Sequence, residues 1–181
     1  KYGINAILSD LDQKRAAETD IQKKDNYAAM QVTLKAVLRL AERYAIIAEK
    51  KAEMATDTRK EQLLHLASTL RRVPADGSHT LFEAIQAYML LWEVMCLEQA
   101  PNPFAFSIGN ADRIFEPYRA MEGLCRDEAA ALLKHFLVFF NVGDRSWAIS
   151  QNLIVSGRDL DGNDMTNNTS YALLDAYYDM N

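Results

Sequence analysis

The densest group of side chains that could bind a metal ion lies in residues 159–164. Carboxylate and amide oxygens in such a run are the ligands used by calcium-binding loops. The spacing does not fit that loop, because Gly162 stands at the wrong offset and the twelfth position is Ser170, which is not acidic. We therefore interpret the run as turn chemistry. Its members are Asp159, Asp161, Asn163 and Asp164.

Other residues able to do chemistry are scattered along the chain. The three histidines fall in different expected elements and have no paired ligand spacing, so a zinc site is not predicted. The sequence contains neither a glycine-rich phosphate loop nor a serine nucleophile elbow. The two cysteines, Cys96 and Cys125, form no disulfide framework, and we expect both to be reduced. Cys96 lies in an apolar helical pattern, where a cysteine is usually a small buried hydrophobic residue.

Composition indicates one globular domain. The chain has 181 residues, of which 49% are apolar and 25% charged, as in soluble proteins with a substantial core. A formal charge of -5 gives no electrostatic reason to expect nucleic acid or an anionic membrane as a partner. No apolar run approaches the roughly 20 residues that span a bilayer, and no signal segment opens the chain. We therefore expect a cytoplasmic protein.

Four long helices are predicted from apolar residues that recur every three or four positions, at 25–54, 59–72, 81–97 and 127–140. Thr80 and Glu83 form a capping-box pattern that fixes the start of the third helix. This helix is apolar on nearly all sides, which predicts that other parts of the protein cover it. Asp127 begins the fourth helix, where its charge suits the positive end of the helix dipole.

Short strands are predicted only in the last 80 residues. Pro101 and Pro103 break the preceding helix, so residues 102–109 should be extended or form a loop. Ile149 and residues 153–155 form a brief apolar and β-branched run that predicts a strand. A polar turn comes next, and Asn167 can cap a last helix. The fold class expected is mostly α with a few strands (α/β).

Three blocks of the sequence resemble the pyruvate formate-lyase family of glycyl radical enzymes. Residues 147–168 resemble a family segment with Gln-Asn, a glycine-rich strand end and Asp-Gly-Asn-Asp-x-Thr-Asn. Residues 80–86 resemble its (Thr/Ala)-x-x-Glu-Ala-x-Gln helix start, and residues 102–118 its Asn-Gly-x-x-x-Ser-x-Gly-Arg-x-Asp segment with a following Pro-Tyr. Their order and separation match the family's, and weaker likenesses at 43–48 and 59–74 extend the resemblance over nearly the whole chain.

The resemblance implies a partial barrel. Residues 1–181 would form a single segment of a pyruvate formate-lyase-type domain, part of a ten-stranded β/α barrel. Residues 1–100 would be outer helices, and residues 101–181 the first barrel strands with their connecting helices. Because the chain begins without Met and stops as a helical pattern finishes, we expect an excised N-terminal-half segment of a longer parent.

The resemblance also implies anaerobic radical chemistry in that parent. A glycyl radical there passes to a cysteine, whose thiyl abstracts a substrate hydrogen and starts cleavage of a C–C, C–O or related bond. Both radical carriers lie C-terminal to the part represented here, and the chain contains no Arg-Val-x-Gly-Tyr sequence. Cys96 and Glu98 spell the family's Cys-x-Glu, but they continue a helix instead of forming a loop. We therefore expect no catalytic residue and no directly bound cofactor here, and a segment that is inactive alone.

The pocket residues that the resemblance implies are Phe104, Ala105 and Trp147. The family strand matched by residues 102–109 lines the barrel interior, and its small or hydroxylic residue, here Ala105, touches the substrate. Trp147 matches a tryptophan that borders the pocket in the formate-lyase branch. The alternative for Phe104 and Trp147 is that both are simply core aromatics. The partners implied are the remainder of the parent, a small organic substrate, a radical-SAM activating enzyme, and a second subunit in a homodimer.

Three departures from the family pattern leave the substrate class open, one of which is Pro103 in place of a glycine next to Asn102. The arginine that commonly comes after Ser-x-Gly is Asn110, which lacks the guanidinium's fork of donors, and a second glycine after the later strand is Arg158. Gln151-Asn152 and the 161–164 turn lean toward a dehydratase, whereas Ala105 leans toward a formate acetyltransferase. Decarboxylase and other lyase activities also stay open. A non-enzymatic helical scaffold or interaction domain is the alternative from another class.

Overall fold

The computed structural model describes residues 2–98, 107–142 and 152–180. The chain divides into two compact units, residues 1–78 and residues 79–181, and each is described by itself. The expected roles of residues 1–100 as outer helices and of residues 101–181 as barrel strands with connecting helices stay predictions. Within the described residues, none of the helices has the length and apolar character needed to cross a bilayer.

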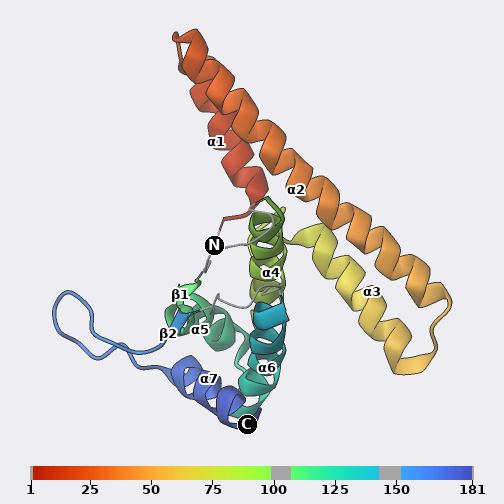
Figure 1. The fold of residues 1–181 in the computed structure, drawn as a ribbon, viewed down its shortest axis with the longest axis vertical. Coiled ribbons are helices and arrows are strands. Elements are labelled where there is room, and N and C mark those ends of the chain that lie inside the picture. Colours follow the sequence, from red (N-terminus) through yellow and green to blue (C-terminus); the bar gives the residue numbers. More distant parts are fainter. Residues whose placement is uncertain (1, 99–106, 143–151, 181) are drawn as a thin grey trace. The chain divides into compact units, whose positions relative to one another are not determined.

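The first unit consists of helices α1 (Ile4–Ala17), α2 (Ile21–Glu53) and α3 (Asp57–Arg72). Short connections place α1 and α3 against α2 (Figure 1). The helices predicted at 25–54 and 59–72 are confirmed, although α2 begins earlier. Its start is set by Asp20, whose carboxylate accepts hydrogen bonds from the amides of Gln22 and Lys23 at 2.8 and 3.3 Å.

Small residues on α2 allow α3 to pack closely against it. Three buried alanines at three- and four-residue spacing face three buried residues of α3. Arg71 on α3 forms ion pairs with Glu42 and Glu49 on α2 at the exposed edge of this interface. The buried set is Ala45, Ala48, Ala52, Leu63, Ala67 and Leu70.

The beginning of α1 is fixed by the backbone of the loop after α3. The amides of Ile4 and Asn5 donate to the carbonyls of Pro74 and Ala75 at 2.8 and 2.9 Å, which satisfies two of the helix's unpaired donors. A Cβ atom on Gly3 would lie 2.2 Å from the carbonyl oxygen of Ala75, so this approach requires glycine. The sequence did not predict α1, because it has no capping side chain and buries only Ile4 and Leu11.

The second unit contains α4 (Leu81–Glu98), β1 (Gly109–Asn110), α5 (Ala111–Glu122), α6 (Arg126–Val142), β2 (Leu153–Ile154) and α7 (Asn168–Tyr178). The predicted helices at 81–97 and 127–140 and the predicted last helix are confirmed. The capping box at α4 is present, since the amide of Glu83 donates to the hydroxyl of Thr80 and the amide of Thr80 donates to the carboxylate of Glu83. α5 was not predicted, because Pro117 lies inside it.

Aromatic side chains from α4, α5 and α6 form the core of this unit. Phe136 lies 5.3 Å from Phe115 and 5.1 Å from Phe140, measured between ring centroids, and Phe140 lies 5.3 Å from Trp92. Each of these four residues is at most 1% exposed. α4 is covered as expected up to Leu90, but Leu91, Met95 and Leu97 are 36%, 39% and 71% exposed.

The two expected extended segments meet in one parallel sheet. Gly109 of β1 pairs with Leu153 of β2, and Asn110 pairs with Ile154. The resemblance implies that both segments contribute strands to one barrel, and this pairing agrees with that expectation. Ile149 lies outside the described residues, and Val155 comes directly after the strand. The closed ten-stranded barrel stays a prediction, because the described part of the chain contains one sheet of two strands.

Candidate functional site

The three predicted pocket residues, Phe104, Ala105 and Trp147, lie outside the described residues. Phe104 and Ala105 precede β1 in the sequence, and Trp147 precedes β2. β1 and β2 are therefore the next described elements after these residues along the chain. The candidate site is built from the ends of the two strands and from the contacts that set their alignment.

Asp112 is the central residue at the ends of the strands. Its side chain lies in the first turn of α5, two residues after β1, and the residue is fully buried. One carboxylate oxygen accepts hydrogen bonds from the amide of Ser156 at 2.6 Å and from the hydroxyl of Ser170. The other accepts from the amide of Arg113 at 2.8 Å. One buried carboxylate thus joins α5, the segment after β2 and α7, and these donors compensate its removal from water.

The bond from Ser156 to Asp112 continues the alignment of the strands. Partners in the sheet differ by 44 residues, and so do Asp112 and Ser156. The carboxylate therefore takes the place of a backbone acceptor where α5 turns away from the sheet. Ser156 has a φ of 63°, a left-handed conformation that is unfavourable for a residue other than glycine.

Arg113 holds the other side of the same turn. Its guanidinium donates to the carbonyl of Ser156 at 3.1 Å and to that of Arg158 at 3.4 Å. Gly157, with a φ of 93°, lies against this guanidinium, where a Cβ atom would come within 3.3 Å of the Arg113 nitrogen. Asp112 and Arg113 together bind both the amide and the carbonyl of Ser156, which stabilises its left-handed conformation.

Glu116, one turn further along α5, binds the start of α7 in the same way. Its carboxylate accepts from the amide of Thr169 at 3.2 Å and from the Thr169 hydroxyl at 2.7 Å. Arg119 donates to both oxygens of this carboxylate at 2.7 and 2.8 Å. The Arg119 guanidinium and, after it, the Thr169 donors hold the pKa of Glu116 below its ordinary value. A carboxylate also suits the positive N-terminal end of α7.

The predicted cap of α7 is confirmed and connects to this network. The amide of Ser170 donates to the Asn167 side chain at 3.1 Å, and the amide of Asn167 donates to the Ser170 hydroxyl at 3.0 Å. The same hydroxyl donates to Asp112. The start of α7 is thereby held by its own capping box and by two carboxylates of α5.

The acidic run between β2 and α7 is a self-contained hairpin, which agrees with its interpretation as a turn. The Asp159 carboxylate accepts from the amides of Asp161 and Asn163 and from the Asn163 side chain, all at 2.8 to 2.9 Å. The Asn163 side chain and the backbone amides lower the pKa of Asp159. Asp164 accepts from the amide and hydroxyl of Thr166, which lower the pKa of Asp164. These oxygens are therefore occupied by donors of the hairpin itself.

Cys96 lies on α4, as predicted, and not in a loop. The residue is half-buried against the main apolar cluster, and burial, followed by the nearby Glu93 carboxylate, raises the pKa of its thiol. Burial also raises the pKa of Glu93, and raises that of Tyr88 to about 12. These environments favour the neutral forms, so Cys96 is not an activated thiolate.

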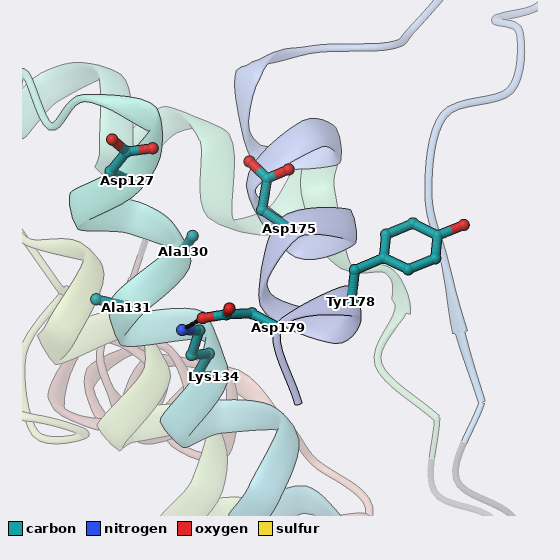
Figure 2. A pocket seen from close by; sticks show the side chains of 7 residues that line it. All are labelled: Asp127, Ala130, Ala131, Lys134, Asp175, Tyr178 and Asp179. Atoms are coloured by element: carbon teal, nitrogen blue, oxygen red, sulfur yellow. Dashed lines mark ion pairs between the residues drawn. The ribbon is translucent and has the colours of Figure 1, made fainter. Parts of the chain in front are cut away.

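A hollow of about 450 Å³ lies between α6 and α7 (Figure 2). Its charged groups are largely matched, since Lys134 pairs with Asp179 and Arg126 pairs with Asp175. The hollow is open, lies apart from the strand ends, and was not predicted from the sequence. Its lining residues are Asp127, Ala130, Ala131, Lys134, Asp175, Tyr178 and Asp179.

The roles of Asp112, Arg113 and Glu116 were not predicted from the sequence. A signal was present for two of them, since Asp112 ends the segment that begins with Ser-x-Gly, and Glu116 stands four residues later on the same helix face. The roles of the two carboxylates could not be predicted, because their hydrogen-bond partners lie 44 to 58 residues away in the sequence.

The strand pair, the capped last helix and the sequence blocks that resemble the pyruvate formate-lyase family together indicate one class of protein. A family model described as pyruvate formate lyase-like matches residues 1–181. The chain belongs to this family.

Individual relatives agree with this assignment. The chain is 32% identical to trans-4-hydroxy-L-proline dehydratase from Clostridioides difficile, over 99% of this chain and 25% of the dehydratase. It is 26% identical to isethionate sulfite-lyase from Desulfovibrio desulfuricans, over 96% of this chain and 24% of the lyase. A crystal structure of a glycyl radical enzyme from Archaeoglobus fulgidus matches 97% of this chain and 25% of its own, with 26% identity and a TM-score of 0.85. The chain thus spans about a quarter of the length of these relatives.

Proposed function

We propose that the chain is part of a glycyl radical enzyme that cleaves a C–C, C–O or related bond of a small organic substrate. The observation that carries this proposal is the parallel pair of β1 and β2, which joins the two sequence blocks that resemble the family. The family model over the whole chain and the glycyl radical enzyme of similar fold support it.

The segment's part in this chemistry is structural. Its helices would form outer layers, and its strands would form part of the wall of a ten-stranded barrel that excludes water and oxygen from the radical. Asp112 and Arg113 would hold the wall's strand alignment through Ser156. Phe104, Ala105 and Trp147 are the proposed pocket residues. The radical glycine and the thiyl cysteine would be supplied by the remainder of the parent.

The other partners belong to the same proposal. A radical-SAM activating enzyme would generate the glycyl radical, and the parent would act as a cytoplasmic homodimer under anaerobic conditions. The reaction subclass is best sought among the activities named for the relatives, a hydroxyproline dehydratase and an isethionate lyase. Formate acetyltransferase activity is a further member of the same class to test.

The test uses the full-length parent, expressed anaerobically with its activating enzyme. Electron paramagnetic resonance should detect a glycyl radical after activation, and product formation should be measured with trans-4-hydroxy-L-proline, isethionate, and pyruvate with coenzyme A. A parent without a radical-bearing glycine, or one that yields neither radical nor product, would instead support a helical scaffold.

The proposed pocket is tested by enlarging one of the side chains that would line it. Ala105→Leu should lower kcat/KM at least tenfold, because three additional carbon atoms would enter the space for the substrate. Ala36→Leu is the matched control, since Ala36 is exposed on α2 and its enlargement should leave kcat/KM unchanged. Equal kinetics for the two variants would remove Ala105 from the pocket.

A further inference from the structure

α7 carries apolar side chains on both of its sides. Its inner side is the buried stripe Ala172, Leu173 and Ala176, which are at most 3% exposed. Tyr171, Leu174 and Tyr178 recur at three- and four-residue spacing on the opposite side and are 46%, 41% and 73% exposed. We call these three residues the outer face of α7. A helix that is apolar on both sides is typical of the interior of a protein.

The charges around this face are already matched. The guanidinium of Arg126 pairs with Asp175 and lies 5.1 Å above the ring of Tyr171, and Lys134 pairs with Asp179. A patch whose charged neighbours pair with each other offers little attraction to a polyanion or a polycation. An occupant of this face should therefore be mainly apolar, with polar groups to meet the tyrosine hydroxyls.

The size of the face favours a segment of the same polypeptide over a second copy of the chain. Three partly exposed side chains of this size offer on the order of 300 Å². A stable interface between separate proteins needs about 800 Å² from each partner. A segment of the same chain needs less, because folding already holds it nearby at high effective concentration.

We propose that the outer face of α7 is covered by a mainly apolar segment of the parent polypeptide from outside these 181 residues. This inference rests on the proposed function only in requiring a longer parent, as relatives about four times this length suggest. The hollow between α6 and α7 adjoins this face, since Tyr178 contributes to both, and it offers room for a side chain of the covering segment (Figure 2).

The test compares two leucines in the purified parent. Leu174 belongs to the outer face, whereas Leu160 stands alone on the hairpin and is 106% exposed. Leu174→Cys and Leu160→Cys are alkylated with a maleimide, and each site is quantified by peptide mass spectrometry. The exposures of 41% and 106% alone allow less than a threefold difference in rate. Protection of Leu174→Cys by more than threefold supports the proposal, and rates within threefold overturn it.

A photo-crosslinker identifies the occupant. Benzoylphenylalanine in place of Tyr178 should give a crosslinked product of monomer mass, joined to a peptide outside residues 1–181. A product of doubled mass would assign the face to a second copy and overturn the proposal. Leu174→Asp should lower the Tm of the parent by several degrees, whereas Leu160→Asp should leave it unchanged.

These readouts need neither radical nor substrate. A protected Leu174→Cys in a parent without turnover would refute the proposed function alone. Rapid labelling in an active parent would refute this inference alone.

Discussion

Replacing Asp112 with alanine should loosen the segment after β2 and the start of α7 while leaving the packing of α2 and α3 unaffected. The substitution removes the acceptor of the Ser156 amide and of the Ser170 hydroxyl, both in a site where Asp112 is fully buried. A buried donor left without a partner costs about 1–3 kcal/mol. Two such donors together would cost about 2–6 kcal/mol. Removing the buried charge returns part of this cost, so we expect a net loss of about 2–4 kcal/mol.

Hydrogen exchange measured by mass spectrometry can locate this loss. Since 1.4 kcal/mol corresponds to a factor of ten, protection of the amides at 153–156 and 168–172 should fall roughly 30- to 1000-fold. The amides of α2 and α3 serve as an internal control, because Asp112 belongs to the other compact unit.

A second substitution tests whether the bond to Ser170 is part of the effect. Ser170→Ala removes one donor and the reciprocal bond of the capping box, and should cost about 1–2 kcal/mol alone. The double variant Asp112→Ala/Ser170→Ala should lose about 1 kcal/mol less stability than the sum of the two single losses. Strict additivity, or equal acceleration of exchange in α2 and α3, would refute the assignment of Asp112 as the residue that joins these elements.

Three further predictions concern other parts of the chain. Gly3→Ala should destabilise the first unit by about 1–3 kcal/mol, because the new methyl group would lie 2.2 Å from a backbone carbonyl oxygen. Thermal unfolding monitored by circular dichroism measures this loss, and an unchanged Tm would contradict the prediction. Cys96 should be alkylated by iodoacetamide more slowly than the exposed second cysteine at pH 8, and its rate should keep rising above pH 9, because burial raises its pKa above 9.0. Glu116→Gln should cost about 1.5–3 kcal/mol at pH 7. Arg119 lowers the folded pKa of Glu116 below its ordinary value of 4.5, so the contribution of the carboxylate is complete above pH 4.5 and is lost as pH falls through the lowered value. Urea unfolding should therefore show the stabilities of the two proteins converging as pH falls below 4.5.

The sequence predicted best those elements whose signals are local. The helices α2, α3, α4 and α6 have long apolar periodicities, and the caps at Thr80 and Asn167 use side chains within three residues of their partners. The strand after Trp147 was predicted from a brief β-branched run. Two prolines after the third predicted helix indicated only an extended segment or a loop, and the family resemblance identified that segment as a strand. These signals do not depend on the rest of the fold.

The missed elements lack such local signals. α1 is held by carbonyls about 70 residues away, at Pro74 and Ala75, and its own sequence shows little amphipathic pattern. α5 contains Pro117, which argues locally against a helix, yet its buried Phe115 and its two carboxylate contacts hold it in place. Tertiary contacts therefore override the local preference at both helices.

The candidate site was predictable only in part. The likeness of residues 102–118 and 147–168 to one family was enough to locate the strand pair from the sequence. The alignment of that pair could not be predicted, because it depends on Asp112 meeting Ser156 across 44 residues. The pocket roles of Phe104, Ala105 and Trp147 stay predictions.

The constant offset between the strands restricts where the chain length can change during evolution. Asp112 stands two positions after Asn110, and Ser156 stands two positions after Ile154. Inserting a residue into either short stretch would carry the carboxylate or its amide about 3.3 Å past the other, beyond hydrogen-bonding reach. Homologous sequences should therefore keep both spacings. They should differ in length within the hairpin after Gly157, whose hydrogen bonds close largely within itself.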